Sequence, residues 1–168
     1  PTLSVKDFTE AGFPVFGANG IIGTYNEFTH TIPTVLIGCR GSVGAIHVTS
    51  GPAYVNGNAM ALDNLKTDVV TVDYLAWFLR FRGFTDIVSG SSQPQITKQN
   101  LVRVTVPVPS LDQQREISAR LNAADTRILH RNQQLLALDE LVKTLFLETL
   151  SSNVTALKLG ELGHILTG

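Results

Sequence analysis

The sequence predicts an α+β fold, a β-rich domain followed by one long helix able to form a coiled coil. Between Phe13 and about Pro109, short apolar or β-branched runs alternate with clusters of Gly, Pro, Asn and Ser, a pattern typical of strands and turns. From Leu111, apolar residues recur in alternating steps of four and three, and no Gly or Pro interrupts them through residue 150. The length of 168 residues suits one domain with an appendage.

Four runs in the first part predict strands. Each contains Val or Ile and is bounded by residues that favour turns. The runs are TVLIG (34–38), GAIHVT (44–49), AYVN (53–56) and VRVTVPV (102–108). We therefore expect residues 1–109 to form one mainly β domain.

One helix is expected within this domain, over TVDYLAWFLRF (71–81). Thr71 or Asp73 can cap its N-terminus, because either side chain can accept a hydrogen bond from a free N–H group of the first turn. Gly83 follows the apolar stretch and is typical of a helix C-terminus. The residues at helical spacing are Leu75, Phe78, Leu79 and Arg82.

The second part, residues 110–150, predicts a long helix with a heptad seam. Ser110 with Asp112 can cap it, and the prolines of PVPS (107–110) prevent an earlier start. At 1.5 Å per residue such a helix is about 60 Å long, more than a β domain of this size needs to cover its core. The seam positions are Ile117, Leu121, Ala124, Ile128, Arg131, Leu135, Leu138, Val142, Leu145 and Thr149, of which Arg131 and Thr149 break the apolar pattern.

This seam requires a partner helix. Because the sequence offers no second helix of comparable length, we expect the partner to come from another part of the protein or from a second copy. In the alternative, the helix breaks near residue 131 and folds back on its own domain. The positions expected to pair are Ile117, Leu121, Ala124, Ile128, Leu135, Leu138, Val142 and Leu145.

The composition argues against several kinds of site. The chain has 13 Lys and Arg against 14 Asp and Glu, so no excess of positive charge indicates a polyanionic partner. Its single cysteine, Cys39, allows no internal disulfide, and the four histidines lack the spacing of a metal-binding pair. No catalytic motif, secretion signal or membrane-spanning run is apparent. We expect no cofactor, no metal ion and no catalytic residue, and a cytoplasmic location.

The stretch IGCRGSVG (37–44) places three glycines around one arginine. Neither it nor FGANGIIGTYN (16–26) has the spacing of a dinucleotide or phosphate-loop fingerprint. Glycines let the main-chain N–H groups approach a ligand, and Arg40 supplies a planar fork of donors, a combination that suits a phosphate or a guanine edge. The alternative is a tight turn with a solvent-exposed arginine.

A second polar loop, SGSSQPQITKQN (89–100), is rich in amide side chains. Gln and Asn can form paired hydrogen bonds with adenine, and Lys98 adds a point charge. The same composition is also that of an ordinary solvated loop. The amide residues are Gln93, Gln95, Gln99 and Asn100.

These segments, in this order, resemble the specificity subunit of type I restriction-modification systems. The resemblance covers essentially the whole chain, through residues 13–28, 33–62 and 89–122. Its most specific part is VPVPSLDQQREISARL (106–121), a Pro-flanked strand, a polar link with a glutamine pair and the start of a heptad helix. KLGELGHILTG (158–168) resembles the opening of a recognition domain of the same family.

The resemblance implies a non-catalytic subunit that recognises DNA. In this family two target recognition domains, held apart by paired long helices, each recognise one half of a bipartite target. Methyltransferase and endonuclease subunits supply the chemistry. It implies a recognition domain over residues 1–109, a spacer or dimerisation helix over 110–150 and, over 151–168, the start of a second repeat or part of the same domain. The chain then resembles half of such a subunit, completed by a second copy or a second half.

The resemblance also indicates which residues face DNA. They lie in the first Gly-rich loop, in the glycine-arginine turn, after the AYVN run and in the polar loop. They are Asn19, Gly20, Tyr25, Arg40, Gly41, Ser42, Asn58, Ser91, Gln93, Gln95, Thr97 and Lys98.

The charge balance departs from what DNA binding alone would favour. Residues 1–110 carry seven basic and seven acidic side chains, so we expect weak, salt-dependent binding and expect methyltransferase subunits to supply the missing cations. In one alternative, the chain is a coiled-coil assembly protein whose β domain binds a protein partner. In another, it is the recognition segment of a fused restriction-methylation enzyme.

Overall fold

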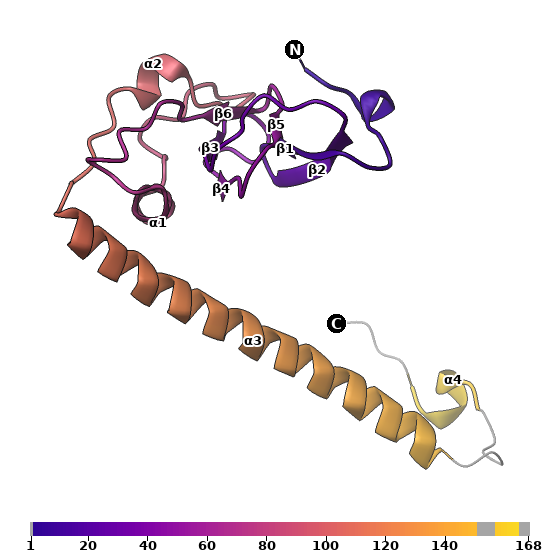
Figure 1. Ribbon diagram of the computed structural model, residues 1–168. Coiled ribbons are helices and arrows are strands. Elements are labelled where there is room, and N and C mark those ends of the chain that lie inside the picture. The colour runs from indigo at the N-terminus through magenta and orange to yellow at the C-terminus, as the bar shows by residue number, and fades with distance from the viewer. Residues whose placement is uncertain (1, 151–156, 165–168) are drawn as a thin grey trace. The chain divides into compact units, whose positions relative to one another are not determined.

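The computed structural model describes residues 2–150 and 157–164 of the protein (Figure 1). The chain divides into two compact units, Pro1–Asn122 and Ala123–Gly168. A short 3-10 helix, Val5–Asp7, precedes the first strand. The other elements are β1 (Phe13–Gly17), β2 (Gly20–Tyr25), β3 (Val35–Gly38), β4 (Ile46–Val48), β5 (Tyr54–Val55), β6 (Ala59–Ala61), α1 (Val72–Arg82), α2 (Lys98–Leu101), α3 (Leu111–Thr149) and α4 (Leu159–Leu162). These elements confirm the expected α+β fold.

The six strands form two small sheets. In the first, with order β2-β1-β5, β1 and β2 make an antiparallel hairpin and β5 runs parallel to β1. In the second, with order β4-β3-β6, both pairs are antiparallel. Three of the four runs expected as strands therefore do contain strands.

Strand β3 lies at the centre of the core, which explains why its sequence is apolar without alternation. Val35 and Ile37 pack in one cluster with residues of α1, whereas Leu36 packs in a second cluster with Phe16 of β1. Because both faces of β3 are covered, its residues are apolar on both faces and do not alternate with polar ones.

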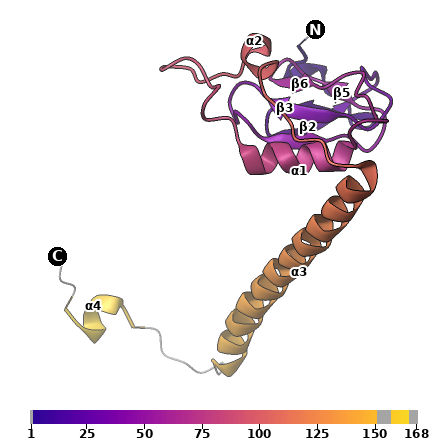
Figure 2. The same ribbon diagram turned by 90° about the vertical axis from the view of Figure 1, so that its left-hand side faces the viewer.

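Helix α1 covers the second sheet (Figure 2). It begins and ends almost where the sequence indicates. Thr71 is the N-cap, and its side chain accepts a hydrogen bond from the Tyr74 N–H group. Gly83 ends the helix with φ of 65°, a conformation that favours glycine. Leu75 and Leu79 point into the core against β3.

The prediction of a fourth strand, over residues 102–108, is wrong. This segment does not pair with either sheet, although Val104 and Val106 are half-buried against the core while their neighbours are exposed. Pro107 has no N–H group to donate to a neighbouring strand. The segment therefore keeps the alternating burial of an extended chain while lying over α1 and β3.

The buried side-chain amide of Gln114 links the start of α3 to the segment that leads into α1. Gln114 is fully buried, and its amide nitrogen donates to the carbonyl oxygens of Val69 (2.9 Å) and Pro109 (2.8 Å). Its amide oxygen accepts from the Thr71 N–H group at 2.8 Å. A second link joins Trp77 to Asn122, whose Oδ1 accepts from the indole Nε1 at 2.7 Å. The first turns of α3 therefore belong to the first unit.

Helix α3 runs unbroken through Arg131, so the structure does not show the break considered near that residue. At its N-terminus, Ser110 and Gln113 form reciprocal hydrogen bonds, so Gln113 completes the cap in place of Asp112. Among the described residues, no helix combines the length and apolar character needed to cross a membrane. Of the expected third segment, 151–168, residues 151–156 and 165–168 lie outside the described residues.

Candidate nucleic-acid interface

The glycine-arginine turn follows β3 and folds back on itself. Gly44 donates its N–H to the carbonyl oxygen of Gly38 at 2.8 Å, and Gly41 and Gly44 have φ values of 77° and 84°. These positive φ values favour glycine because a side chain would be strained there. The turn leaves Arg40 exposed to solvent.

Most glycines of this turn serve packing, contrary to the expectation that they bare the backbone for a ligand. A Cβ atom on Gly38 would lie 2.3 Å from the carbonyl oxygen of Ser42, and one on Gly44 would lie 3.0 Å from the Phe84 ring. Only Gly41 faces open space within 4 Å of its position. The compact turn itself therefore requires two of the three glycines.

The main-chain N–H groups of the turn are also largely occupied. Cys39 and Arg40 both donate to the carbonyl oxygen of Asn58, at 2.8 and 3.4 Å. Val43 donates within the turn to Gly41, and Ala45 to Ser42. In the described part of the chain, only the N–H groups of Gly41 and Ser42 remain without a protein acceptor in this turn.

The polar loop lies directly against the glycine-arginine turn, although 55 positions separate the residues that join them. Arg40 and Gln95 form an antiparallel β-bridge, and the Arg40 Nε–H donates to Gln95 Oε1 at 3.4 Å. The Ile96 N–H group donates to the Cys39 carbonyl oxygen at 3.1 Å. Two loops that the sequence indicated separately therefore form one surface.

We call this surface the Arg40 hollow. The polar loop is closed by paired hydrogen bonds between the backbones of Ser89 and Gln95, at 2.8 and 2.9 Å. The hollow is lined by Arg40, Gly41, Ser92, Gln93, Pro94 and Gln95. Ser92 and Pro94 were not singled out in the sequence, although the composition of the loop pointed to the segment that contains them.

The tip of the β1–β2 hairpin lies beside the same turn. A Cβ atom on Gly38 would lie 2.7 Å from the carbonyl oxygen of Ala18, which immediately precedes the exposed Asn19. The backbone of Asn58, also exposed, holds the other side of the turn. Three other stretches of sequence, namely the hairpin tip, the segment at Asn58 and the polar loop, therefore border the turn that carries Arg40.

Four of the expected DNA-facing residues have other surroundings. Tyr25 is half-buried edge-on against Tyr54, with ring centroids 5.5 Å apart. Gly20 is buried with φ of 95°, and Thr97 caps α2 by accepting from the Asn100 N–H group. Lys98 lines a different hollow, formed with residues of 60–70 and 101–102. Contact of these four with DNA stays a prediction.

Arg40 is the cation of this hollow with no acidic partner. Within the described ranges, no ion pair includes it. Other arginines of the first unit are engaged: Arg80 stacks over the Trp77 ring, and Arg82 binds Asp86. The hydrogen bonds from Arg82 hold the pKa of the Asp86 carboxyl below its ordinary value. Of these three arginines, only Arg82 is paired with a carboxylate, and only Arg40 lines the hollow.

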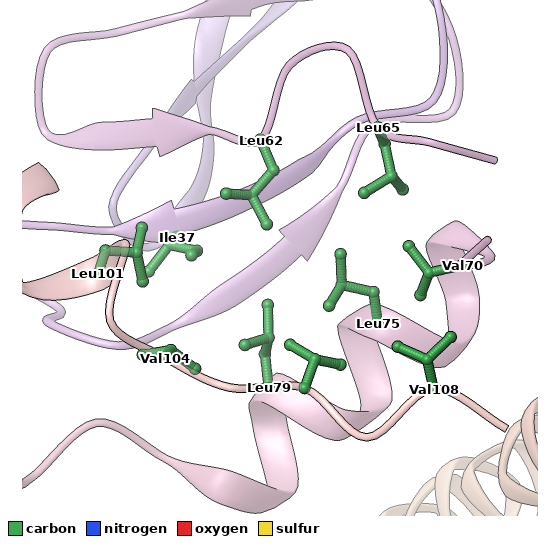
Figure 3. Close-up of a pocket in the computed structure, with 10 residues that line it drawn as sticks. Ile37, Leu62, Leu65, Val70, Leu75, Leu79, Leu101, Val104 and Val108 are labelled. Carbon is green, nitrogen blue, oxygen red and sulfur yellow. The ribbon is translucent and has the colours of Figure 1, made fainter.

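A second, apolar hollow of about 220 Å³ lies within the core of the first unit (Figure 3). Leu75 and Leu79 of α1 point toward Leu62 and Leu65, and Val104 and Val108 lie along its other side. This lining offers no polar group for recognition. Among residues 2–150 and 157–164, no three His, Cys, Asp or Glu residues lie together as metal ligands.

The later turns of α3 carry an exposed apolar surface. Ile117 and Leu121 are 39% and 38% exposed, whereas the larger apolar side chains from Ile128 to Leu147 are 51–66% exposed. Ala124 is exposed as well. From residue 128 on, the exposed apolar side chains at expected seam positions are Ile128, Leu135, Leu138, Val142 and Leu145. Exposed apolar side chains outside the seam are Leu129, Leu136, Leu141, Phe146 and Leu147.

Comparison with known protein families gives a match over most of the chain. A family model described as the type I restriction modification DNA specificity domain matches residues 1–138. The specificity subunit of the type I restriction enzyme EcoprrI from Escherichia coli is 29% identical over 115 residues, 68% of this chain and 28% of that protein. That of MjaIX from Methanocaldococcus jannaschii is 25% identical over 117 residues, 67% of this chain and 27% of that protein. The chain thus spans little more than a quarter of the length of these relatives.

Solved structures share the fold. The crystal structure of the S subunit of a type I restriction-modification system from M. genitalium has a TM-score of 0.64 at 17% identity, covering 86% of this chain and 39% of that one. The HsdS subunit from Thermoanaerobacter tengcongensis has a TM-score of 0.55 at 21% identity, covering 76% of this chain and 34% of that one. At these identities the likeness shows the fold alone, a β-rich domain followed by a long helix.

Proposed function

Because the chain belongs to the type I restriction-modification DNA specificity family, we propose that it recognises one half of a bipartite DNA target. In this proposal it is the non-catalytic part of a specificity subunit, and it positions methyltransferase and endonuclease subunits on that target. The first unit makes the sequence-dependent contacts, and α3 joins it to a second recognition unit.

The observation that carries the proposal is the Arg40 hollow. Amide and hydroxyl side chains surround a guanidinium that no described carboxylate neutralises. Arginine and amide side chains supply most base-specific contacts in a DNA major groove. We propose that the contacting residues are those around the hollow, namely Asn19, Arg40, Gly41, Ser42, Asn58, Ser91, Gln93 and Gln95.

The exposed apolar face of α3 supports pairing with a second long helix. Complete burial of an exposed leucine gains about 1.5–3 kcal/mol, so leucines that are more than half exposed, repeated over several turns, each gain a large part of that when a partner covers them. We propose that the partner is the equivalent helix of a second copy or of a second half of the protein. Apolar residues outside the seam, such as Leu129 and Leu136, leave a further face for a methyltransferase subunit.

The balanced charge of the first unit sets the expected strength of binding. Neutralised phosphates supply most non-specific affinity, and seven basic residues are offset by seven acidic ones in residues 1–110. We therefore expect weak binding by the isolated chain at physiological salt and tighter binding once methyltransferase subunits close around the duplex.

The test is selection of bound duplexes from a randomised library, at low salt, with and without the cognate methyltransferase subunit. Enrichment of a short motif is the expected result, and a spaced motif with two-fold symmetry would add support for helix-paired copies. The control for loss of a positive charge is Arg103→Ala, which removes an exposed cation of the same unit that does not line the hollow. This variant should select the same motif as the unaltered chain. If no motif is enriched even with the methyltransferase present, the chain is better explained as a coiled-coil assembly protein whose β domain binds a protein.

A further inference from the structure

We infer that Arg40 recognises a guanine in the major groove and that Gln95 is the positioning residue that orients it, an inference that rests on the proposed function. Arg40 and a backbone rich in glycine suit either a phosphate or a guanine edge when only their sequence is considered. The contacts around the turn distinguish these two ligands.

A phosphate site at this turn would need several main-chain N–H groups facing one point. Those of Arg40, Val43 and Gly44 already donate to protein carbonyl oxygens. Gly38 and Gly44 are needed for close packing, so their lack of a side chain does not open the backbone to a ligand. In the described part of the chain, only the N–H groups of Gly41 and Ser42 are free in this turn, two donors rather than the longer row that cradles a phosphate.

The charge distribution points in the same direction. Lys98, the other cation of the polar loop, lines a separate hollow, and Arg80 and Arg82 are held by Trp77 and Asp86. A phosphate would meet one guanidinium here, without a second cation in the lining of the hollow. The amides of Gln93 and Gln95 beside Arg40 are typical partners of base edges.

The contact between Gln95 and Arg40 determines which N–H donors of the guanidinium remain free for a ligand. The Arg40 Nε–H donates to Gln95 Oε1, and the backbones of the two residues are joined by a β-bridge. In the described part of the chain, the two terminal nitrogens of Arg40 have no hydrogen-bond partner. Two coplanar donors match the N7 and O6 acceptors of guanine, whereas adenine presents one acceptor and one donor at the same places.

The experiment uses the duplex obtained by selection, with single base analogues at each guanine. For the unaltered chain, 7-deazaguanine, which lacks the N7 acceptor but keeps O6, should weaken binding at one position by part of the about 5- to 150-fold that a whole bidentate contact contributes. Inosine at that position lacks only a minor-groove amino group and should bind nearly as well. With Arg40→Ala, guanine and 7-deazaguanine should bind equally.

Gln95→Ala tests the positioning role. It should reduce the preference for guanine at that same position several-fold, leave the other positions of the motif unchanged, and have no further effect when combined with Arg40→Ala. A merely structural role would lower binding to all sequences alike. Arg103→Ala, the matched exposed cation, should leave the guanine preference intact.

Two results would overturn the inference while leaving DNA recognition in place. In the first, Arg40→Ala changes no position of the motif, or changes a position that is not guanine. In the second, Arg40→Ala weakens binding to all duplexes equally and makes the salt dependence shallower by about one phosphate contact. If the unaltered chain selects no motif even with the methyltransferase subunit present, the proposed function fails and the inference fails with it.

Discussion

The first unit and the part of α3 beyond Asn122 treat the same residue types in opposite ways. In the first unit, Leu36, Leu75 and Leu79 are at most 5% exposed, while Leu135 and Leu138 of α3 are more than half exposed. Leucines held in water contribute no hydrophobic stabilisation to a folded chain. The core of the first unit is thus completed by its own residues, whereas the apolar side chains of the α3 seam have no such cover within the described chain, in keeping with the proposed partner helix.

The polar side chains of the two regions also differ, in whether they are buried and hydrogen-bonded. Buried polar side chains of the first unit, such as Gln114 and Thr49, have hydrogen-bond partners within the unit. On the later turns of α3, the ion pair Lys143–Glu140 is exposed, and a pair of this kind contributes little to stability. Stability within the first unit thus depends on buried networks, and the later turns of α3 lack an equivalent.

The comparison is tested most severely by Leu135→Asp with Leu138→Asp. Losing two leucines on each of two paired helices removes several kcal/mol of apolar burial and places charges in the seam, so association should weaken by at least about 1000-fold. Sedimentation velocity would measure the change. Asn132→Asp with Gln133→Asp, off the seam, is the control for added charge. Unchanged association of the seam variant would contradict the pairing proposal.

The buried amide of the first unit is tested by the neighbouring glutamines 113 and 114. Gln114→Ala leaves the Thr71 N–H group and two carbonyl oxygens without partners, and should cost about 3 kcal/mol of unfolding free energy. Gln113→Ala removes only an exposed cap contact and should cost about 1 kcal/mol or less. Urea unfolding followed by Trp77 fluorescence measures both. Equal losses would show that the burial of Gln114 has no special role.

The smallest expected difference is within the glycine-arginine turn. Gly38→Ala places a methyl group against two backbone oxygens and should cost about 2–3 kcal/mol. Gly41→Ala meets open space and should cost only about 1 kcal/mol, because the strain of a positive φ remains. The midpoints of thermal unfolding compare the two. A larger loss for Gly41→Ala would contradict the packing role assigned to Gly38.

Sequence alone determined the elements that depend on near neighbours. The Thr71 cap, the Gly83 terminus and the start of α3 at Leu111 follow from side chains within a few residues, and the heptad spacing predicted a long helix whose apolar seam is interrupted only at Arg131 and Thr149. The same reasoning failed for residues 102–108, because an alternating pattern describes an extended chain whether or not another strand is there to pair with it.

Only the tertiary structure decided what surrounds Arg40. The sequence indicated the two loops of the Arg40 hollow but not that Arg40 and Gln95 meet, because no local pattern relates residues 55 positions apart. It also could not distinguish a glycine that admits a ligand from one, such as Gly38, that admits a neighbouring backbone. Capping and periodicity act within a few turns of chain, whereas contact, burial and the use of hydrogen-bonding groups depend on segments that only folding brings together.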